Sequence, residues 1–293
     1  MGELYKYLST VPKPFLDDMV RGNVIPLVGA GFTKNADIPE GITIPDWEEL
    51  ARAAAREIPD YTYSGNPIDT LSYYERLYSR ARLIEFLMRE LHIGQVKPGP
   101  THKAFCEIFD NIILTTNFDD LLEQTYRKLD KTISIVITQD RLSVSQQGEI
   151  SIVKLHGDMT LPMSMVITER DYDAWLRHNS VMVSYISSLF STKTILLIGY
   201  SLDDYDLRNV WKAVSDNLGL MARPAYYITV GASREKEMRY ERRNVKVINL
   251  PNDMNDYKTA LREFFVELRQ YIEENRNPVL KQKYVGLYNL DMK

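Results

Sequence analysis

Two side chains able to hold a polar ligand follow the apolar run at residues 112–115. The stretch reads IILTTNFDD over residues 112–120, so Asn117 and Asp119 stand just beyond a predicted strand. The Asn117 amide has both a donor and an acceptor and can orient a ribose hydroxyl or a water molecule. Asp119 fits two interpretations equally well, a ligand contact and an N-cap of the helix predicted from DDLLEQ. Capping explains Asn117 less well, because it lies two residues earlier.

His156 also ends a predicted strand, in the sequence SIVKLHG, where Gly157 follows it. A single histidine is usually structural, but one at a strand end before a glycine is well placed to face a ligand. Its imidazole can accept or give a proton near neutral pH, which makes it a candidate general base. His92, His102 and His178 lie in helical or loop context and are assigned no chemistry.

A glycine pair follows the first apolar run, in VGAGFT at residues 28–33. Without Cβ atoms in the way, backbone N–H groups can approach a phosphate, and a following helix start adds positive charge. A glycine pair alone is often only a tight turn. The full dinucleotide fingerprint is absent, because Lys34 stands where its third glycine would be and no acidic residue ends a strand about twenty residues on. An ordinary dehydrogenase is therefore disfavoured.

The strands that position these residues are predicted from short unbroken apolar runs, which are typical of parallel strands covered on both faces. The runs are NVIPLVGAGF, NIILTTNF, TISIVIT, ISIVKLHG, KTILLIGYS, PAYYITVG and NVKVINLP. Helical patterns alternate with them, which predicts an α/β fold with a doubly wound, mainly parallel, Rossmann-like sheet. Ligands of such sheets bind beyond the carboxyl ends of the strands, where the glycines, Asn117, Asp119 and His156 are expected to meet.

We interpret residues 1–293 as one domain with a helical insert at residues 60–100, where tyrosine and arginine are frequent and no strand is predicted. Residues 275–293 are interpreted as a C-terminal extension. The net charge of −4 and the lack of a basic run give no support for direct nucleic-acid binding. We found no secretion signal and no membrane-spanning run, which favours a cytoplasmic protein.

The sequence offers little for a metal. Cys106 is the only cysteine, so an internal disulfide and a multi-cysteine zinc site are excluded. The histidines are too dispersed to form a paired metal motif. The three aspartates in SLDDYD are more simply explained as caps of the helix that follows than as Mg²⁺ ligands. No metal is expected.

In their order along residues 22–250, the motifs resemble the sirtuin-like NAD-consuming proteins, the family named for silent information regulator two. The resemblance rests on a glycine-alanine-glycine loop, a T-x-N-x-D strand end, a leucine-histidine-glycine motif and a glycine-x-serine-leucine turn. These are Gly29–Ala30–Gly31, then Thr115, Asn117 and Asp119, then Leu155, His156 and Gly157, then Gly199, Ser201 and Leu202.

The resemblance implies roles for individual residues. Asn117 would orient the nicotinamide ribose and the attacking water, Asp119 would hold the carboxamide, and His156 would be the general base. The residues implied to bind NAD elsewhere are Gly29, Ala30, Gly31, Phe32, Thr33, Thr116, Gly199, Ser201 and Asn249.

The sequence departs from the deacylases of this family. It lacks their four-cysteine zinc ribbon and the valine-phenylalanine-glycine-glutamate strand that lines the acyl-lysine tunnel. GYSLDDYDL and ITERDY look instead like the sirtuin-like domains of bacterial antiphage defence systems, which cleave NAD⁺ to nicotinamide and ADP-ribose. We therefore expect an NAD⁺ glycohydrolase. An NAD-dependent protein deacylase and a non-catalytic NAD-binding subunit remain alternatives.

By the same resemblance, the activity would be gated by assembly into a homo-oligomer or by a partner such as a HerA-type ATPase. Candidate contact surfaces are the aromatic C-terminal tail and the tyrosines of the insert, although those tyrosines are as well explained by packing within it. The tyrosines are Tyr61, Tyr63, Tyr73, Tyr74 and Tyr78.

Overall fold

The computed structural model describes residues 5–144, 148–200, 212, 216–219, 222–251 and 256–276. Within them a parallel sheet of seven strands runs in the order β3-β4-β2-β1-β5-β6-β7. The strands are β1 (Val24–Val28), β2 (Ile112–Thr115), β3 (Ile133–Val136), β4 (Ile150–Lys154), β5 (Thr194–Ile198), β6 (Ala225–Val230) and β7 (Val245–Leu250). The predicted doubly wound parallel sheet is confirmed. Because the chain leaves β1 toward β2 and later returns to the other side of β1 with β5, the ends of the central strands form the crevice typical of such sheets.

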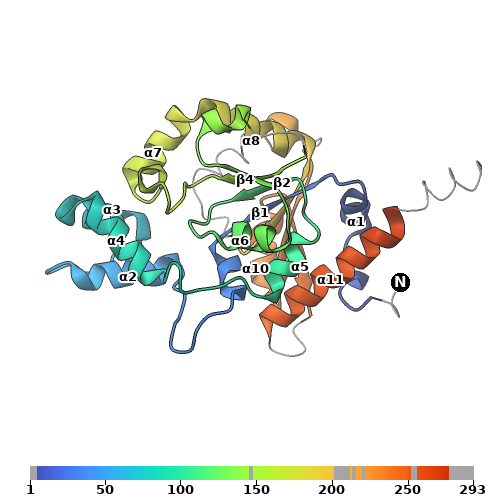
Figure 1. Cartoon of the computed structure of the whole chain (residues 1–293), viewed down its shortest axis with the longest axis horizontal. Coiled ribbons are helices and arrows are strands. Elements are labelled where there is room, and N and C mark those ends of the chain that lie inside the picture. Colours follow the sequence, from blue (N-terminus) through green and yellow to red (C-terminus); the bar gives the residue numbers. More distant parts are fainter. Residues whose placement is uncertain are drawn as a thin grey trace, which may run out of the picture.

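Helices cover both faces of the sheet (Figure 1). One face is covered by α1 (Lys13–Val20), α5 (Pro100–Cys106), α6 (Leu121–Lys128) and α11 (Tyr257–Arg276). The other is covered by α7 (Glu169–His178), α8 (Ser180–Thr192) and α10 (Arg234–Glu241). Short 3₁₀ helices lie at η1 (Leu8–Thr10), η2 (Ala30–Asn35), η3 (Gln139–Ser143) and η4 (Pro162–Ser164).

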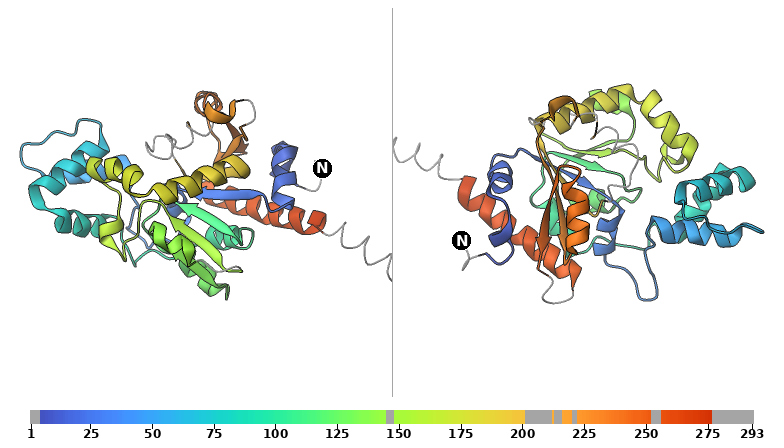
Figure 2. Two further views of the ribbon diagram at one scale, coloured as in Figure 1. Left: turned by 90° about the horizontal axis from the view of Figure 1, so that it is seen from above. Right: turned by 180° about the vertical axis from the view of Figure 1, so that it is seen from behind.

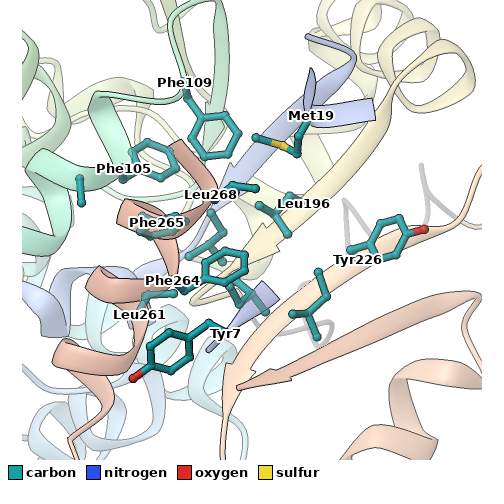
Figure 3. Close-up of a cluster of buried hydrophobic side chains, with 14 of the residues drawn as sticks. Tyr7, Met19, Phe105, Phe109, Leu196, Tyr226, Leu261, Phe264, Phe265 and Leu268 are labelled. Atoms are coloured by element: carbon teal, nitrogen blue, oxygen red, sulfur yellow. The ribbon is translucent and has the colours of Figure 1, made fainter. Parts of the chain in front are cut away.

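Alternate side chains of the strands enter two separate cores. Val28, Ile113 and Leu196 point into the core under α11, whereas Leu27 and Leu114 enter the core under α8. Aromatic rings from α5 and α11 fill the first core against the strands (Figure 3). This two-sided burial explains why the strands read as unbroken apolar runs.

The part of the chain that connects β1 to β2 forms a separate helical group, which projects from the rest of the fold (Figure 2). It consists of α2 (Trp47–Glu57), α3 (Pro67–Tyr78) and α4 (Arg80–Glu90), so it includes one helix that precedes residue 60. The segments that lead into and out of this group are joined by two backbone hydrogen bonds between Asp37 and Lys97, of 2.9 and 3.2 Å. At the start of α2, Asp46 and Glu49 form a capping box.

The helical group packs against the segment that follows β4. Met159, Met165 and Ile167 are buried in its core. Arg80 at the start of α4 donates to the Met165 carbonyl oxygen (2.5 Å) and to the Asp171 carboxylate on α7 (2.7 Å). No helix in the part of the chain that the structure describes has the length and apolar character needed to cross a membrane.

Candidate functional site

A cavity of about 1270 Å³ lies where the sheet's strand ends face the helical group. Ordinary small-molecule pockets have roughly 300–1,000 Å³, so this one has room for a ligand as large as a dinucleotide. It is lined by residues that follow β1, β2, β4 and β5, by residues of β6 itself, and by α2, α3, α10 and the segment after α4. Of the residues predicted to touch NAD, those on its wall are Gly29, Ala30, Gly31, Thr33, Thr116, Asn117, Asp119, His156 and Gly199.

The ends of β1 and β5 approach each other so closely that only glycine fits. The Gly31 N–H donates to the Gly199 carbonyl oxygen at 2.8 Å. A Cβ on Gly29 would lie 2.6 Å from the Tyr200 Cα, and one on Gly199 would lie 2.2 Å from the Phe32 nitrogen. Gly199 also has a φ of +59°, which favours glycine. The three glycines therefore form a tight floor of the cavity, made of backbone without side chains.

Asn117, Thr33 and Asp119 form a hydrogen-bonded chain beside this floor. The Asn117 Nδ2 donates to the Thr33 Oγ1 (3.2 Å), and the Thr33 hydroxyl donates to the Asp119 Oδ2 (2.7 Å). Asn117 is 8% exposed, and its Oδ1 is buried with no hydrogen-bond partner among the described residues. A buried carbonyl oxygen without a donor is costly, so this atom is suited to accept a hydrogen bond from a ligand.

The other Asp119 oxygen accepts from the Leu121 N–H at 3.2 Å, at the start of α6. The N-cap position of α6 is Asp120, but Asp119 combines the two interpretations made from the sequence, since its side chain satisfies the first N–H of the helix and also lines the cavity. Burial raises the pKa of its carboxyl, and the charge of Lys154 and the Thr33 hydrogen bond oppose that rise.

His156 is the second residue after β4 and is 6% exposed. Its ring makes an edge contact with the Tyr172 ring on α7, with 5.5 Å between centroids. Its carbonyl oxygen accepts from the Val166 N–H at 2.9 Å, which brings the segment after β4 back against it. Since β4 is hydrogen-bonded to β2, the imidazole and the Asn117 amide reach the cavity from neighbouring strand ends.

A buried ionic cluster lies behind this wall. The Lys154 ammonium at the end of β4 donates to the Glu123 carboxylate (3.0 Å) and to the Asp119 carbonyl oxygen (2.6 Å), and it pairs with Asp158. Burial by itself lowers the pKa of Lys154, but the two carboxylates outweigh it and the net shift is upward. Burial likewise opposes ionisation of Asp158, yet the contact with Lys154 brings its pKa below the ordinary value.

Two described residues of the predicted set do not line the cavity. Phe32 is buried in the core, 5.2 Å from Phe105 between ring centroids. Asn249 instead fixes the turn after β6, where its amide bonds the Ala232 N–H (2.8 Å) and carbonyl (2.9 Å). Ser201 lies outside the described residues.

The cavity wall also contains residues that the sequence interpretation missed. Basic and aromatic side chains line it near β6 and α10, among them Lys236 and the stacked Tyr227 and Tyr240 rings, 4.2 Å apart. The helical group contributes Trp47 and Ile68. No motif marks these residues, because helices distant in sequence bring them to the site. Lys154 did leave a signal, as a lone lysine in the apolar run ISIVKL. Over the ranges that the structure describes, no group of three His, Cys, Asp or Glu residues could hold a metal ion.

Comparison with known proteins agrees with this arrangement. A family model described as the SIR2-like domain matches residues 111–248, which run from β2 into β7 and include Asn117, Asp119 and His156. Over this range the chain is similar to the SIR2-like domain. The glycine floor after β1 and the helical group lie outside the matched range.

Similar curated proteins share most of the chain. NAD(+) hydrolase ThsA of Acinetobacter baumannii is 29% identical over 193 residues, covering 65% of this chain and 39% of that protein. The protein of the same name from Bacillus cereus is 23% identical over 284 residues, which cover 94% of this chain and 58% of that protein. Defense-associated sirtuin 2 of Bacillus subtilis is 21% identical over 257 residues, which cover 84% of this chain and 25% of that protein. The chain therefore spans between 25% and 58% of the length of these relatives.

Proposed function

We propose that this sirtuin-like domain hydrolyses NAD⁺ to nicotinamide and ADP-ribose. The observation that carries the proposal is one dinucleotide-sized cavity that joins a floor of glycines to a wall formed by Asn117, Asp119 and His156. The names of the two ThsA relatives, both NAD(+) hydrolases, support the same reaction.

The proposed reaction breaks the bond between the nicotinamide nitrogen and the ribose carbon. The bonding electron pair leaves with nicotinamide, which becomes neutral, and positive charge develops on the ribose. A water molecule then bonds to that carbon and gives up a proton. NAD⁺ and water thus yield nicotinamide, ADP-ribose and one proton. Because nicotinamide is already a good leaving group, the protein needs mainly to orient the ribose and to place the water.

Each polar residue has a proposed part in this reaction. His156 accepts the proton of the attacking water, a step that contributes roughly 10²–10⁴ in rate when the base is well placed. The buried Oδ1 of Asn117 accepts a hydrogen bond from a ribose hydroxyl or from the water. Asp119 accepts one from the nicotinamide carboxamide, and the phosphates lie against the glycine floor, where no side chain stands in their way.

We further propose that the reaction serves antiphage defence by depleting NAD⁺, which the name of the Bacillus subtilis relative supports. An enzyme of this kind needs to be restrained in uninfected cells. Control by homo-oligomerisation or by a HerA-type ATPase stays a prediction from the family resemblance.

The test is to incubate the chain with NAD⁺, with and without an acetyl-lysine peptide, and to identify the products by mass spectrometry. Hydrolysis predicts nicotinamide and ADP-ribose in both reactions. Acetyl-ADP-ribose formed only with the peptide would favour a deacylase instead. Tight binding of NAD⁺ without any product would favour a non-catalytic subunit.

A further inference from the structure

A charged side chain is buried directly behind the wall of the site. The Lys154 side chain is 0% exposed, and those of its carboxylate partners Glu123 and Asp158 are 3% and 6% exposed. Lys154 does not line the cavity, so it has no direct access to a ligand there. Any influence of this lysine on the site therefore passes through the residues that it holds.

Lys154 joins the two loops that supply the polar wall. Its Nζ donates to the Asp119 carbonyl oxygen at 2.6 Å, in the loop that also contains Asn117. It pairs with Asp158, two residues beyond His156. It also donates to Glu123 on α6 at 3.0 Å, which anchors the ammonium to the helix capped by Asp119. One ammonium group therefore connects the Asn117–Asp119 loop to the loop of His156.

Stability alone explains this cluster poorly. Removing charges from water costs several kcal/mol per ion, and replacing a buried ion pair by apolar residues is often neutral or stabilising. The ladder between β2 and β4, which pairs Thr115 with Lys154, already aligns the two strands up to that point. Beyond it the chains separate into loops. The ammonium links these loops through the Asp119 carbonyl oxygen and the Asp158 carboxylate, beside one long backbone hydrogen bond from the Met159 N–H to the Phe118 carbonyl oxygen (3.5 Å).

We propose that Lys154 is a positioning residue that fixes the Asn117–Asp119 loop relative to His156, so that these side chains meet one substrate. This inference rests on the proposed function, because it concerns the geometry in which that reaction takes place. An error of about 1 Å in such a geometry can cost about 10²-fold in rate.

The same cluster sets the charge that Asp119 experiences. Facing its carboxyl are the Thr33 hydroxyl from η2, Lys154 from β4, and the neighbouring acids Asp120 and Glu123. The charge of Lys154 lowers the pKa of Asp119, whereas Glu123 repels it. Loss of the ammonium and loss of the Glu123 charge should therefore displace the ionisation of Asp119 in opposite directions.

The experiment compares Lys154→Met and Glu123→Gln in the full chain, with Lys103→Met as the control because the Lys103 side chain is 64% exposed. For Lys154→Met we expect kcat to fall by about 10- to 100-fold, with little change in KM or in the Kd of ADP-ribose. The acidic limb of its kcat–pH profile should move to higher pH, and that of Glu123→Gln to lower pH. Lys103→Met should match the parent in every measurement.

Lys154→Met leaves two buried carboxylates unpaired and can fail to fold for that reason. A second variant, Lys154→Met with Glu123→Gln and Asp158→Asn, removes the charge of all three residues and is read together with its melting temperature. The proposal expects a low kcat in this variant even when the melting temperature is parental. Parental kcat and an unmoved pH profile in either folded Lys154 variant would overturn it.

Failure of the inference is distinguishable from failure of the proposed function. A parent chain that cleaves NAD⁺, together with unaltered Lys154 variants, rejects the positioning role alone. A parent chain that cleaves no NAD⁺ rejects the proposed function. The same variants are then compared by ¹³C NMR titration of the Asp119 carboxyl and by chemical shifts of the His156 ring. Opposite displacements of Asp119, with a moved His156 signal in Lys154→Met, support the link, and unchanged signals overturn it.

Discussion

Asn117 is the residue whose surroundings point most directly to a ligand. Its Nδ2 is committed to Thr33, while its Oδ1 is buried without a donor among the residues described. A helix cap would have placed this amide against the backbone of α6, a role that Asp119 performs instead. The unsatisfied oxygen therefore supports the proposal that a bound molecule completes the site.

Substituting Asn117 or His156 separates the site from the fold. For His156→Ala we expect turnover of NAD⁺ to drop by roughly 10²–10⁴, the usual contribution of a positioned acid–base group. For Asn117→Ala we expect a drop of about 10²-fold, because the ribose or the water is no longer correctly oriented. The melting temperature should stay near the parental value. His178→Ala is the control, because His178 is exposed at the end of α7, does not line the cavity and was assigned no chemistry. Parental turnover in Asn117→Ala or His156→Ala would mean that the site residues are wrongly assigned.

The motif residues of the site could be predicted because each one ends an apolar run. Strand ends of a parallel sheet share one edge, so the sequence alone was enough to place Asn117, Asp119 and His156 together. Lys154 could not be placed in the same way. A lysine at a strand end normally faces water, and only the packing of α6 over β4 makes it buried. Phe32 shows a second limit of the sequence. It was predicted to bind NAD because of its place in the glycine motif, but a motif does not tell which way a side chain points, and the Phe32 ring is buried in the core.

At the scale of elements, the contact between the ends of β1 and β5 depends on glycine. Gly199→Ala should destabilise the chain in two ways, since a left-handed alanine costs about 1–2 kcal/mol and its Cβ would overlap the Phe32 nitrogen. Gly219→Ala is the matched control, because Gly219 has a similar φ of +54° and no atom within 4 Å of the added Cβ.

The two glycine variants are compared by urea unfolding. Gly199→Ala should lose about 1–3 kcal/mol more than Gly219→Ala, the usual cost of overpacking. Equal losses of unfolding free energy in the two variants would show that the close approach of the two strand ends does not contribute to the cost of the Gly199 substitution.

The helical group is linked to the His156 loop through Arg80. This side chain is 15% exposed and binds Asp171 and the Met165 carbonyl oxygen, and the neighbouring Val166 N–H donates to His156. Arg80→Met should cost about 1.5–3 kcal/mol, the range for hydrogen bonds to charged groups, and should also lower kcat. Arg82→Met is the control, since Arg82 is 68% exposed and pairs only locally with Glu85.

Chemical denaturation and steady-state kinetics measure both arginine variants. Arg82→Met should stay within about 1 kcal/mol of the parent, as is usual for exposed pairs. If Arg80→Met were as stable and as active as Arg82→Met, the helical group would not support the site.

At the scale of the whole molecule, the pH dependence of stability should show a contribution from His102. Burial lowers the pKa of this side chain from 6.5 to about 4, and the charge of Lys258 acts in the same direction. A lowered pKa means that the unfolded chain binds the proton more readily. The contribution of neutral His102 to the free energy of unfolding is therefore complete above pH 6.5. It is lost as the pH falls toward 4, and the total loss is roughly 3 kcal/mol.

His102→Leu removes this titration and should flatten the stability curve between pH 6.5 and pH 4, as measured by urea unfolding at several pH values. The Nδ1 atom of His102 has no hydrogen-bond partner within the described part of the chain, so the substitution breaks no hydrogen bond of that atom there. An equal fall in stability for His102→Leu and the parent would assign the pH dependence to other groups.

The fold and the order of the motifs along the chain could be predicted from apolar runs, because each strand is buried on both faces. The cavity could not, since the helical group and α10 reach it from distant parts of the sequence. The proposed chemistry as a whole depends on the direction in which a dinucleotide lies in this cavity.

A structure of the His156→Ala variant with NAD⁺ bound is the most direct measurement of that direction. We predict the nicotinamide ribose beside Asn117 and Asp119, and the phosphates over Gly29, Gly31 and Gly199. A nicotinamide ring found near α10, with Asn117 and Asp119 touching no part of the ligand, would contradict the proposed chemistry.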